Sequence, residues 1–397
     1  MTSRSPYKGI RVVDISHAIA GPYCAMALAR MGADVVKVEP IEGDFARNVG
    51  TQYPGKHTDL SIAANLGKRS IAVDLKSKAG SEVLKKLLSS ADVFIENFRP
   101  GVADKLGFSY EEVAALNDHI IYLSSSGWGS AGPFKERPGT DTDLQAFSGF
   151  MAKNVGSDGV PIRSQLLWVD FAAALYNVQA LQAALWERHF QGHGSHINNS
   201  LLETSAAFQS HAILNSVLRN TAATSDVKAY PFGNFRCADG YVQITVLRDE
   251  EFKRFMQMLG LSDLGEDLRL STAADRYLNR ELIDQPIKEA LAKLNLDDVC
   301  ARLADLRMLH ARINTYEDFL EHEQTQEVGA FFWSDHPDVG RIPLANIPAT
   351  ERLTENSRHV KAPRLGEHTS EIMQELSYTD TQIQTLEEQH CVFCDRN

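Results

Sequence analysis

The sequence begins with short β-branched runs that alternate with segments of helical spacing. Residues 10–16 (IRVVDIS) form the first run, residues 21–32 (GPYCAMALARMG) have helical spacing, and residues 33–40 (ADVVKVEP) form the second run. Pro22 just inside this helix and Gly32 at its end are typical helix punctuation. The alternation continues with strands at 70–77, 92–98 and 119–127 and helices at 78–91 and 109–117. It predicts an α/β fold with a doubly wound, mostly parallel sheet.

Ligands of such folds bind in the loops that leave the carboxyl ends of the strands. Three loops are therefore candidates: residues 16–22 (SHAIAGP), 96–101 (ENFRPG) and 125–139 (SSGWGSAGPFKERPG). No GxGxxG follows the first strand and no GxxxxGK[ST] occurs, so the sequence gives no support for NAD, FAD or P-loop nucleotides. Cations recur near the strand ends, which indicates a phosphate-bearing ligand, although most such residues are ordinary solvated surface. They are Lys37, Lys68, Arg69, Lys76, Arg99, Lys105, Lys135 and Arg137.

The rest of the chain predicts a helical segment followed by a second, smaller domain. Residues 165–220 read as helical, with a turn at 190–199 (FQGHGSHINN), and a linker-like stretch follows. Amphipathic helices and one strand then indicate a smaller α+β domain. The predicted domains are residues 1–225 for the first part of the large domain, 226–325 for the small domain, and 326–397 for a segment that returns to the large domain.

Composition excludes several classes of protein. The net charge of −12 argues against a nucleic-acid or anionic-membrane binder. No apolar run is long enough to span a membrane, and no secretion signal is evident. The cysteines form no disulfide framework, and the CVFC tail reads as free thiols at a loose terminus. No cluster of His, Cys, Asp or Glu has metal-ligand spacing, so we expect no metal. Together, these features predict a cytoplasmic protein.

Asp170 is the single charge in the apolar stretch 165–185 (QLLWVDFAAALYNVQALQAAL). A carboxylate at a helix N-terminus is expected to stay ionised, because free N–H groups and the helix dipole favour the anion. An oriented anion suits a nucleophile better than a general acid. A plain Asp N-cap explains the same pattern, so both interpretations stay open at this point.

Nine motifs in chain order resemble the class III CoA-transferases, between about residues 9 and 376. They are VVDISHAIAGP, GADVVKVEP, NLGKRSIAVDLKS, ADVFIENFRPG, LGFSYEEV, SSGWGSAGPF, RPGTDTDLQAFSG, LLETSAAF and APRLGEHTSEI. The resemblance implies a Rossmann-like large domain with a smaller α+β domain, in an interlocked homodimer. It also implies that CoA and acyl-CoA are substrates and that no cofactor is bound permanently.

The resemblance also assigns residues to roles. Asp170 matches the catalytic aspartate, which forms a mixed anhydride and then a thioester with CoA. Asp141 matches an acidic position that supports the active site. The implied CoA site consists of His17, Ala18, Ala20, Val73, Lys76, Asn97, Phe98, Arg99, Lys105 and Arg137.

Departures from the family pattern define the alternatives. The racemase motif GHDINY is replaced by GTDTDLQ, and a 2-methylacyl-CoA epimerase needs a His/Asp acid–base pair that the sequence does not offer. The glycine-rich flap of formyl-CoA transferase is absent near residues 226–240, and Asn198 stands where an Asp is common. We expect CoA transfer to a short dicarboxylate such as succinate, malate, mesaconate or glutarate. The alternatives are the epimerase and a non-catalytic CoA-binding protein.

Overall fold

The computed structural model describes residues 5–156, 158–221, 229–348 and 350–396. The chain divides into two compact units, of which one combines residues 1–213 with 329–397 and the other spans 214–328. The predicted boundary between residues 225 and 226 lies outside the described residues, and the predicted domain limits stay a prediction. In the described part of the chain, no helix is both long and apolar enough to cross a membrane.

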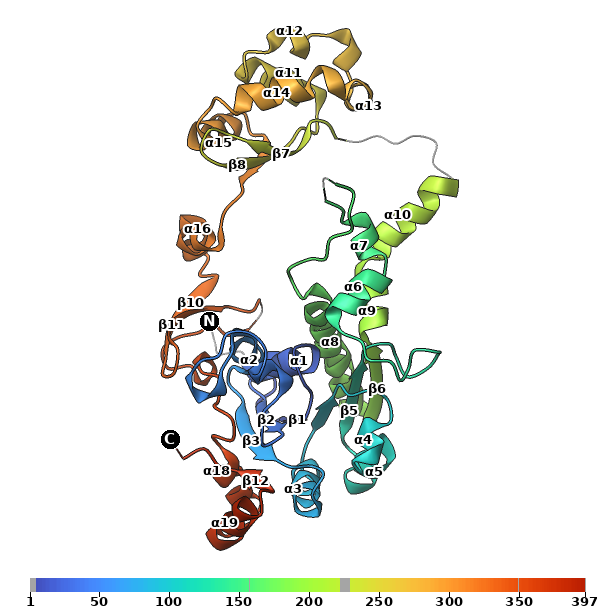
Figure 1. Ribbon diagram of the computed structural model, residues 1–397, viewed down its shortest axis with the longest axis vertical. Helices are drawn as coiled ribbons and strands as arrows, with labels where there is room; N and C mark the ends of the chain where they lie inside the picture. The colour runs from blue at the N-terminus through green and yellow to red at the C-terminus, as the bar shows by residue number, and fades with distance from the viewer. Residues whose placement is uncertain (1–4, 157, 222–228, 349, 397) are drawn as a thin grey trace. The chain divides into compact units, whose positions relative to one another are not determined.

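The first unit is built on a seven-stranded sheet with the order β12-β3-β2-β1-β4-β5-β6 (Figure 1). Its strands are β1 (Arg11–Asp14), β2 (Asp34–Glu39), β3 (Arg69–Val73), β4 (Val93–Glu96), β5 (Ile121–Ser126), β6 (Ser195–Ser200) and β12 (Val392–Phe393). All neighbouring pairs are parallel except β12 and β3, which pair antiparallel. The predicted α/β fold with a large parallel sheet is confirmed.

Helices cover both faces of this sheet. They are α1 (Ala20–Arg30), α2 (Asp59–Asn65), α3 (Lys78–Leu88), α4 (Val102–Lys105), α5 (Tyr110–Leu116), α6 (Asp141–Phe147), α7 (Phe150–Lys153), α8 (Trp168–Gln191), α9 (Leu201–Phe208), α18 (Thr369–Glu375) and α19 (Asp380–Glu388). A hairpin of β10 (Phe331–His336) and β11 (Gly340–Ala345) belongs to the same unit. Helix α10 (Ser210–Thr221) crosses the limit between the two units.

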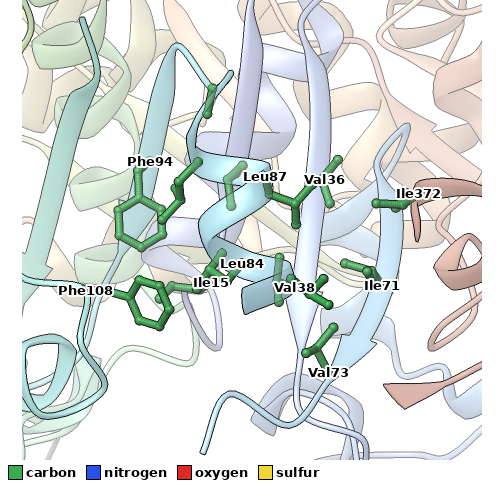
Figure 2. Packing of buried hydrophobic residues seen from close by; sticks show 14 of the residues in the cluster. Ile15, Val36, Val38, Ile71, Val73, Leu84, Leu87, Phe94, Phe108 and Ile372 are labelled. Atoms are coloured by element: carbon green, nitrogen blue, oxygen red, sulfur yellow. The ribbon is translucent and has the colours of Figure 1, made fainter. Parts of the chain in front are cut away.

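Strands β1 to β5 are buried on both faces, which explains their nearly continuous apolar runs. Val12 of β1 packs in one cluster with Leu28 of α1 and Leu181 of α8. Its neighbour Val13 points to the opposite face, where the cluster includes Leu84 of α3 and Ile372 of α18 (Figure 2). Helices α1 and α8 therefore lie together on one face, and this pairing positions the site described below.

The second unit has its own core. Its three-stranded antiparallel sheet has the order β7-β8-β9, formed by β7 (Phe232–Arg236), β8 (Tyr241–Thr245) and β9 (Leu309–Arg312). Its helices are α11 (Asp249–Met258), α12 (Ser262–Gly265), α13 (Ala273–Leu278), α14 (Asp284–Leu291), α15 (Leu296–Asp305), α16 (Tyr316–Glu321) and α17 (Glu323–Glu327). Phe252, Phe255 and Ile287 are fully buried within this unit.

Two sequence interpretations of the first unit are wrong. Residues 195–199 lie in the stretch interpreted as a turn, but they belong to β6, whose backbone pairs with β5 along its whole length. The CVFC tail is not a loose end, because Val392 and Phe393 pair with Val73 and Ala72. Cys391 and Cys394 are free thiols, as predicted.

Candidate active site

Asp170 lies in the first turn of α8, a 24-residue helix that ends at Gly192 with a left-handed backbone (φ 76°). The helix is rich in Ala and Leu, which have high helix propensity, and its inner side packs against α1 and the sheet. Leu167 precedes the first turn and provides no side-chain cap. The N–H groups of this turn therefore need an acceptor from elsewhere in the chain.

Asp141 supplies that acceptor. Its Oδ2 accepts hydrogen bonds from the backbone N–H of Val169 (2.8 Å) and of Asp170 (3.1 Å). Gln145, one turn further along α6, donates from Nε2 to Asp141 Oδ1 (2.6 Å). Asp141 is 3% exposed and Gln145 is fully buried. The interpretation of Asp170 as an N-cap is wrong, because Asp141 caps α8 and leaves the Asp170 carboxylate uncommitted.

The expectation that Asp170 stays fully ionised is also wrong. Burial, followed by the negative charge of Asp141, raises the pKa of Asp170 to about 7. Burial also raises the pKa of Asp141. The N–H groups of Val169 and Asp170, which would stabilise an anion, bind Asp141 instead, so they do not offset the desolvation of Asp170. Asp170 is a half-buried carboxyl group that titrates near neutrality.

The loop between β1 and α1 is fixed by two other loops. Asn97, after β4, accepts from His17 N at Oδ1 (2.7 Å) and donates from Nδ2 to His17 O (2.8 Å). Asp44, after β2, accepts from Ala18 N at Oδ1 (3.1 Å). Ala18 has a positive φ of 61°, a conformation that such flanking bonds must maintain. Asp44 Oδ1 also lies 3.4 Å from His17 Nδ1, a His/Asp pair that the sequence did not reveal.

This loop leads directly to the start of α8. Ala20 belongs to one apolar cluster with Val169 and Ala173. The ring of Tyr23 contacts that of Phe171, the neighbour of Asp170, edge-on at 4.9 Å. The structure thus brings the predicted loop residues to the helix end that carries the candidate nucleophile.

A cavity of about 450 Å³ opens at the carboxyl ends of the strands. His17, Val73, Lys76 and Phe98 are among its lining residues, and the rings of His17 and Phe98 lie 5.2 Å apart. The sequence predicted all four for the CoA site. Arg99, Lys105 and Arg137 are exposed and do not line this cavity; Arg137 lies over the rings of Trp128 and Phe134.

Three of the cations that the sequence places near the strand ends are structural. Lys68 Nζ donates to Asp14 Oδ2, Pro22 O and Asn65 Oδ1, each at 2.8 Å, and lies in the interior. Lys37 is also buried and lies 3.4 Å from Asp44 Oδ2. Arg69 pairs with Asp34, Glu371 and Glu375. A buried charge in a protein requires such partners, so these cations support the loops without facing a ligand.

Two residues of the site were missed from the sequence. Asp44 lies in the loop after β2. Its position after the carboxyl end of a strand is the sequence feature that could have identified it as a site residue. Gln145 is four residues after Asp141, so helical spacing alone places both on one side of α6.

One group of side chains outside this site has metal-ligand types. His57, His336 and Asp338 bring ligand atoms within 4.8 Å of one another. Burial lowers the pKa of His57 to about 4, so its imidazole is neutral. Asp338, however, accepts from Arg364 Nε with both oxygens (3.0 and 2.9 Å). The Asp338 carboxylate is thus already neutralised by Arg364. The expectation of no metal stays a prediction.

Comparisons with known proteins show the family of this chain. A sequence model described as CoA-transferase family III matches residues 7–369. The succinyl-CoA:glutarate CoA-transferase of Homo sapiens is 29% identical over 97% of this chain and 90% of its own length. The succinate–glutarate CoA-transferase of Agrobacterium fabrum is 31% identical over 94% of this chain and 96% of its own length.

A solved structure supports the same assignment. The crystal structure of a CAIB/BAIF family protein from Brucella suis superposes with a TM-score of 0.85 at 30% identity, over 94% of this chain and 100% of its own. The chain therefore belongs to CoA-transferase family III, which confirms the prediction of an acyl-CoA:carboxylate CoA-transferase.

Proposed function

We propose that this enzyme moves CoA from a donor such as succinyl-CoA to a short dicarboxylic acid, with Asp170 as the nucleophile. The placement of Asp170 carries the proposal, because Asp141 caps the helix and leaves the Asp170 carboxylate free beside the loop at His17–Ala20. The names of the human and Agrobacterium fabrum relatives refer to succinate and glutarate, which supports the substrate class.

The reaction proceeds through four nucleophilic acyl substitutions, and the Asp170 carboxylate takes part in each. Asp170 Oδ attacks the carbonyl carbon of the donor thioester and the C–S bond breaks. This step releases CoA thiolate and forms a mixed anhydride between Asp170 and the donor acyl group. The thiolate then attacks the aspartyl carbonyl of the anhydride and releases the donor acid, which gives an aspartyl-CoA thioester. The acceptor carboxylate attacks this thioester, expels CoA thiolate and forms a second anhydride. The thiolate finally attacks the acceptor acyl carbon, which releases the new acyl-CoA and restores Asp170.

The environment of Asp170 suits these steps. A carboxylate with a pKa of about 7 is more basic than an ordinary aspartate, so it is the stronger nucleophile when ionised. The same burial reduces competition from water for the anhydride and the thioester. The N–H groups of Val169 and Asp170 are committed to Asp141, so oxyanion stabilisation must come from other donors near the site.

The CoA site is proposed at the cavity lined by His17, Val73, Lys76 and Phe98. Ala18, Ala20 and Asn97 hold the adjoining loop in place. Arg99, Lys105 and Arg137 are exposed cations, and we propose them as the partners of the CoA phosphates.

We also propose the interlocked homodimer, with α8 contributing to its interface. Leu175, Trp186 and Phe190 are exposed by 58%, 68% and 68% and follow one side of α8. Apolar side chains of this size gathered on one exposed helix favour a protein contact. The free cysteines support a cytoplasmic location.

The test is a CoA exchange assay read by mass spectrometry. Purified enzyme with succinyl-CoA and a panel of free acids is expected to yield the new acyl-CoA only when Asp170 is present. Hydroxylamine or borohydride added during turnover should modify Asp170. D170A should abolish exchange, whereas E82A, which removes an exposed carboxylate on α3, should leave it unchanged. Exchange by D170A at the full rate, or epimerisation without exchange, would refute the mechanism.

A further inference from the structure

Gln145 of α6 is fully buried, and both ends of its amide group have backbone partners. Its Oε1 accepts from the N–H of Ser164 (2.8 Å), and its Nε2 donates to the carbonyl oxygen of Leu166 (3.2 Å). A backbone N–H can only donate and a backbone carbonyl can only accept, so both contacts require the same orientation of the amide. The Nε2 group therefore faces Asp141, and Gln145 is a donor to that carboxyl group (2.6 Å).

Asp141 is consequently surrounded by hydrogen-bond donors. Its Oδ1 accepts from Gln145, and its Oδ2 accepts from the backbone N–H groups of Val169 and Asp170. Among the residues that the structure describes, none provides an acceptor to this carboxyl group. A protonated carboxyl group is itself a donor and needs an acceptor for its proton. The hydrogen bonds around Asp141 therefore favour its ionised form.

The carboxyl group of Asp170 has the opposite environment. It is half-buried, and no side chain or backbone N–H in the described part of the chain donates to its oxygens. A desolvated carboxyl group without donors favours its neutral form. When the two carboxyl groups hold a single proton, this difference in hydrogen bonding places the proton on Asp170 and the negative charge on Asp141.

Other charged groups near the pair are exposed. Helices α7, α8 and α9 pack against α6, and Asp170 is the charged residue in the first turns of α8. The remaining charged residues on α6, α7, α9 and the segment before α8 are exposed to solvent, which weakens their effect: Asp143, Lys153, Asp158, Arg163 and Glu203. Burial raises the pKa of Asp141, and the hydrogen bonds from Asp170 N and Gln145 oppose this effect. The charge of Arg163 acts in the same direction as these hydrogen bonds.

We propose that Gln145 is a positioning residue that keeps Asp141 ionised and thereby keeps Asp170 a basic nucleophile. The inference rests on the proposed function and adds a residue that acts on Asp170 only through Asp141. A fixed negative charge beside Asp170 raises the energy of its carboxylate, but not that of the uncharged anhydride and thioester. The charge of Asp141 therefore favours the attack of Asp170 on the donor thioester.

Q145M tests this role, because methionine is unbranched and of similar length but has no amide. The experiment measures kcat/KM for succinyl-CoA against pH, with glutarate as the acceptor. In Q145M, Asp141 loses the donor to its Oδ1 and takes up a proton more readily, so the pKa of Asp170 should fall. The acid limb should move to lower pH by about one pH unit, as expected for the loss of one nearby charge. The plateau rate should also decrease, because the nucleophile is less basic.

Three further variants separate this role from damage to the structure. Q145L has the same expected result and provides the test if Q145M does not fold. Q209L removes an amide donor at the other end of α6, where Gln209 Nε2 donates to Ser148 Oγ (2.8 Å), and should leave the acid limb in place. In D141N there is no charge for Gln145 to maintain, so D141N/Q145M should have the same acid limb as D141N.

The outcomes distinguish the inference from the proposed function. An acid limb that stays in place in Q145M while only the rate falls would overturn the inference. A further displacement in D141N/Q145M, or an equal displacement in Q209L, would do the same, and CoA transfer by the wild type would still support the proposed function. A wild type that transfers no CoA to any acid would refute the proposed function and the inference with it.

Discussion

Replacing Asp170 by Asn should stabilise the folded protein at high pH while it abolishes catalysis. The pKa of Asp170 is raised from 3.8 to about 7. A carboxyl group with a raised pKa retains its proton more readily in the folded state than in the unfolded one, so its ionisation opposes folding. Folding stability falls as the pH rises from about 4 to about 7, and above pH 7 the whole cost is present.

The size of the effect follows from the shift. Each pKa unit corresponds to 1.36 kcal/mol, so ionising Asp170 costs at most about 4 kcal/mol of the free energy of unfolding. The side chain is only partly buried, and screening by solvent reduces this to roughly 2 kcal/mol. Asparagine has nearly the same shape and no charge, so D170N avoids the cost.

Urea denaturation of wild type and D170N, at equal protein concentration and at several pH values between about 4.5 and 8.5, measures the difference. We expect D170N to gain stability steadily up to pH 7 and to keep the gain above it. E82Q provides the control, because Glu82 is exposed and pairs with Lys85 at the surface, so its replacement should change stability far less than D170N does. A difference between D170N and wild type that does not vary with pH would refute the reasoning.

Two further predictions concern the groups around Asp170. In D141N, the loss of a negative charge should lower the pKa of Asp170. The acid limb of the plot of kcat/KM against pH should therefore move to lower pH. An acid limb that does not move contradicts the coupling of the two carboxyl groups. In D44A, the N–H of Ala18 loses its acceptor and buried Lys37 loses one of its partners. Breaking such a pair costs about 3–5 kcal/mol of unfolding free energy, and a loss below about 1 kcal/mol in urea denaturation would contradict this account.

Local patterns were sufficient to predict most of the first unit. The apolar runs of β1 and β2 and the punctuation of α1 by Pro22 and Gly32 depend on neighbouring residues, and the structure places these elements as expected. Strand β6 was missed because its sequence, SHINNS, is polar. It is an edge strand of the sheet, and backbone pairing with β5 determines its structure.

The chemistry of the site depends on contacts that no local pattern contains. Asp141 and Asp170 are 29 residues apart, and only the packing of α6 beside α8 shows which of them caps the helix. The ionisation of Asp170 was misjudged for this reason. Lys37 is one of the cations near the strand ends, most of which are expected at the solvated surface, but β2 is central in the sheet and covered on both faces. Its partners Asp14 and Asp44 come from other loops, so its burial follows from topology.

The antiparallel pairing of β12 with β3 has a consequence for biosynthesis. Val73 emerges from the ribosome early, but its partner Val392 is translated only after the entire second unit. Until then the outer edge of β3 has unpaired N–H and C=O groups, which favour pairing with other chains. The nascent enzyme therefore carries an open sheet edge for most of its translation, and this edge is where a chaperone would protect it from aggregation.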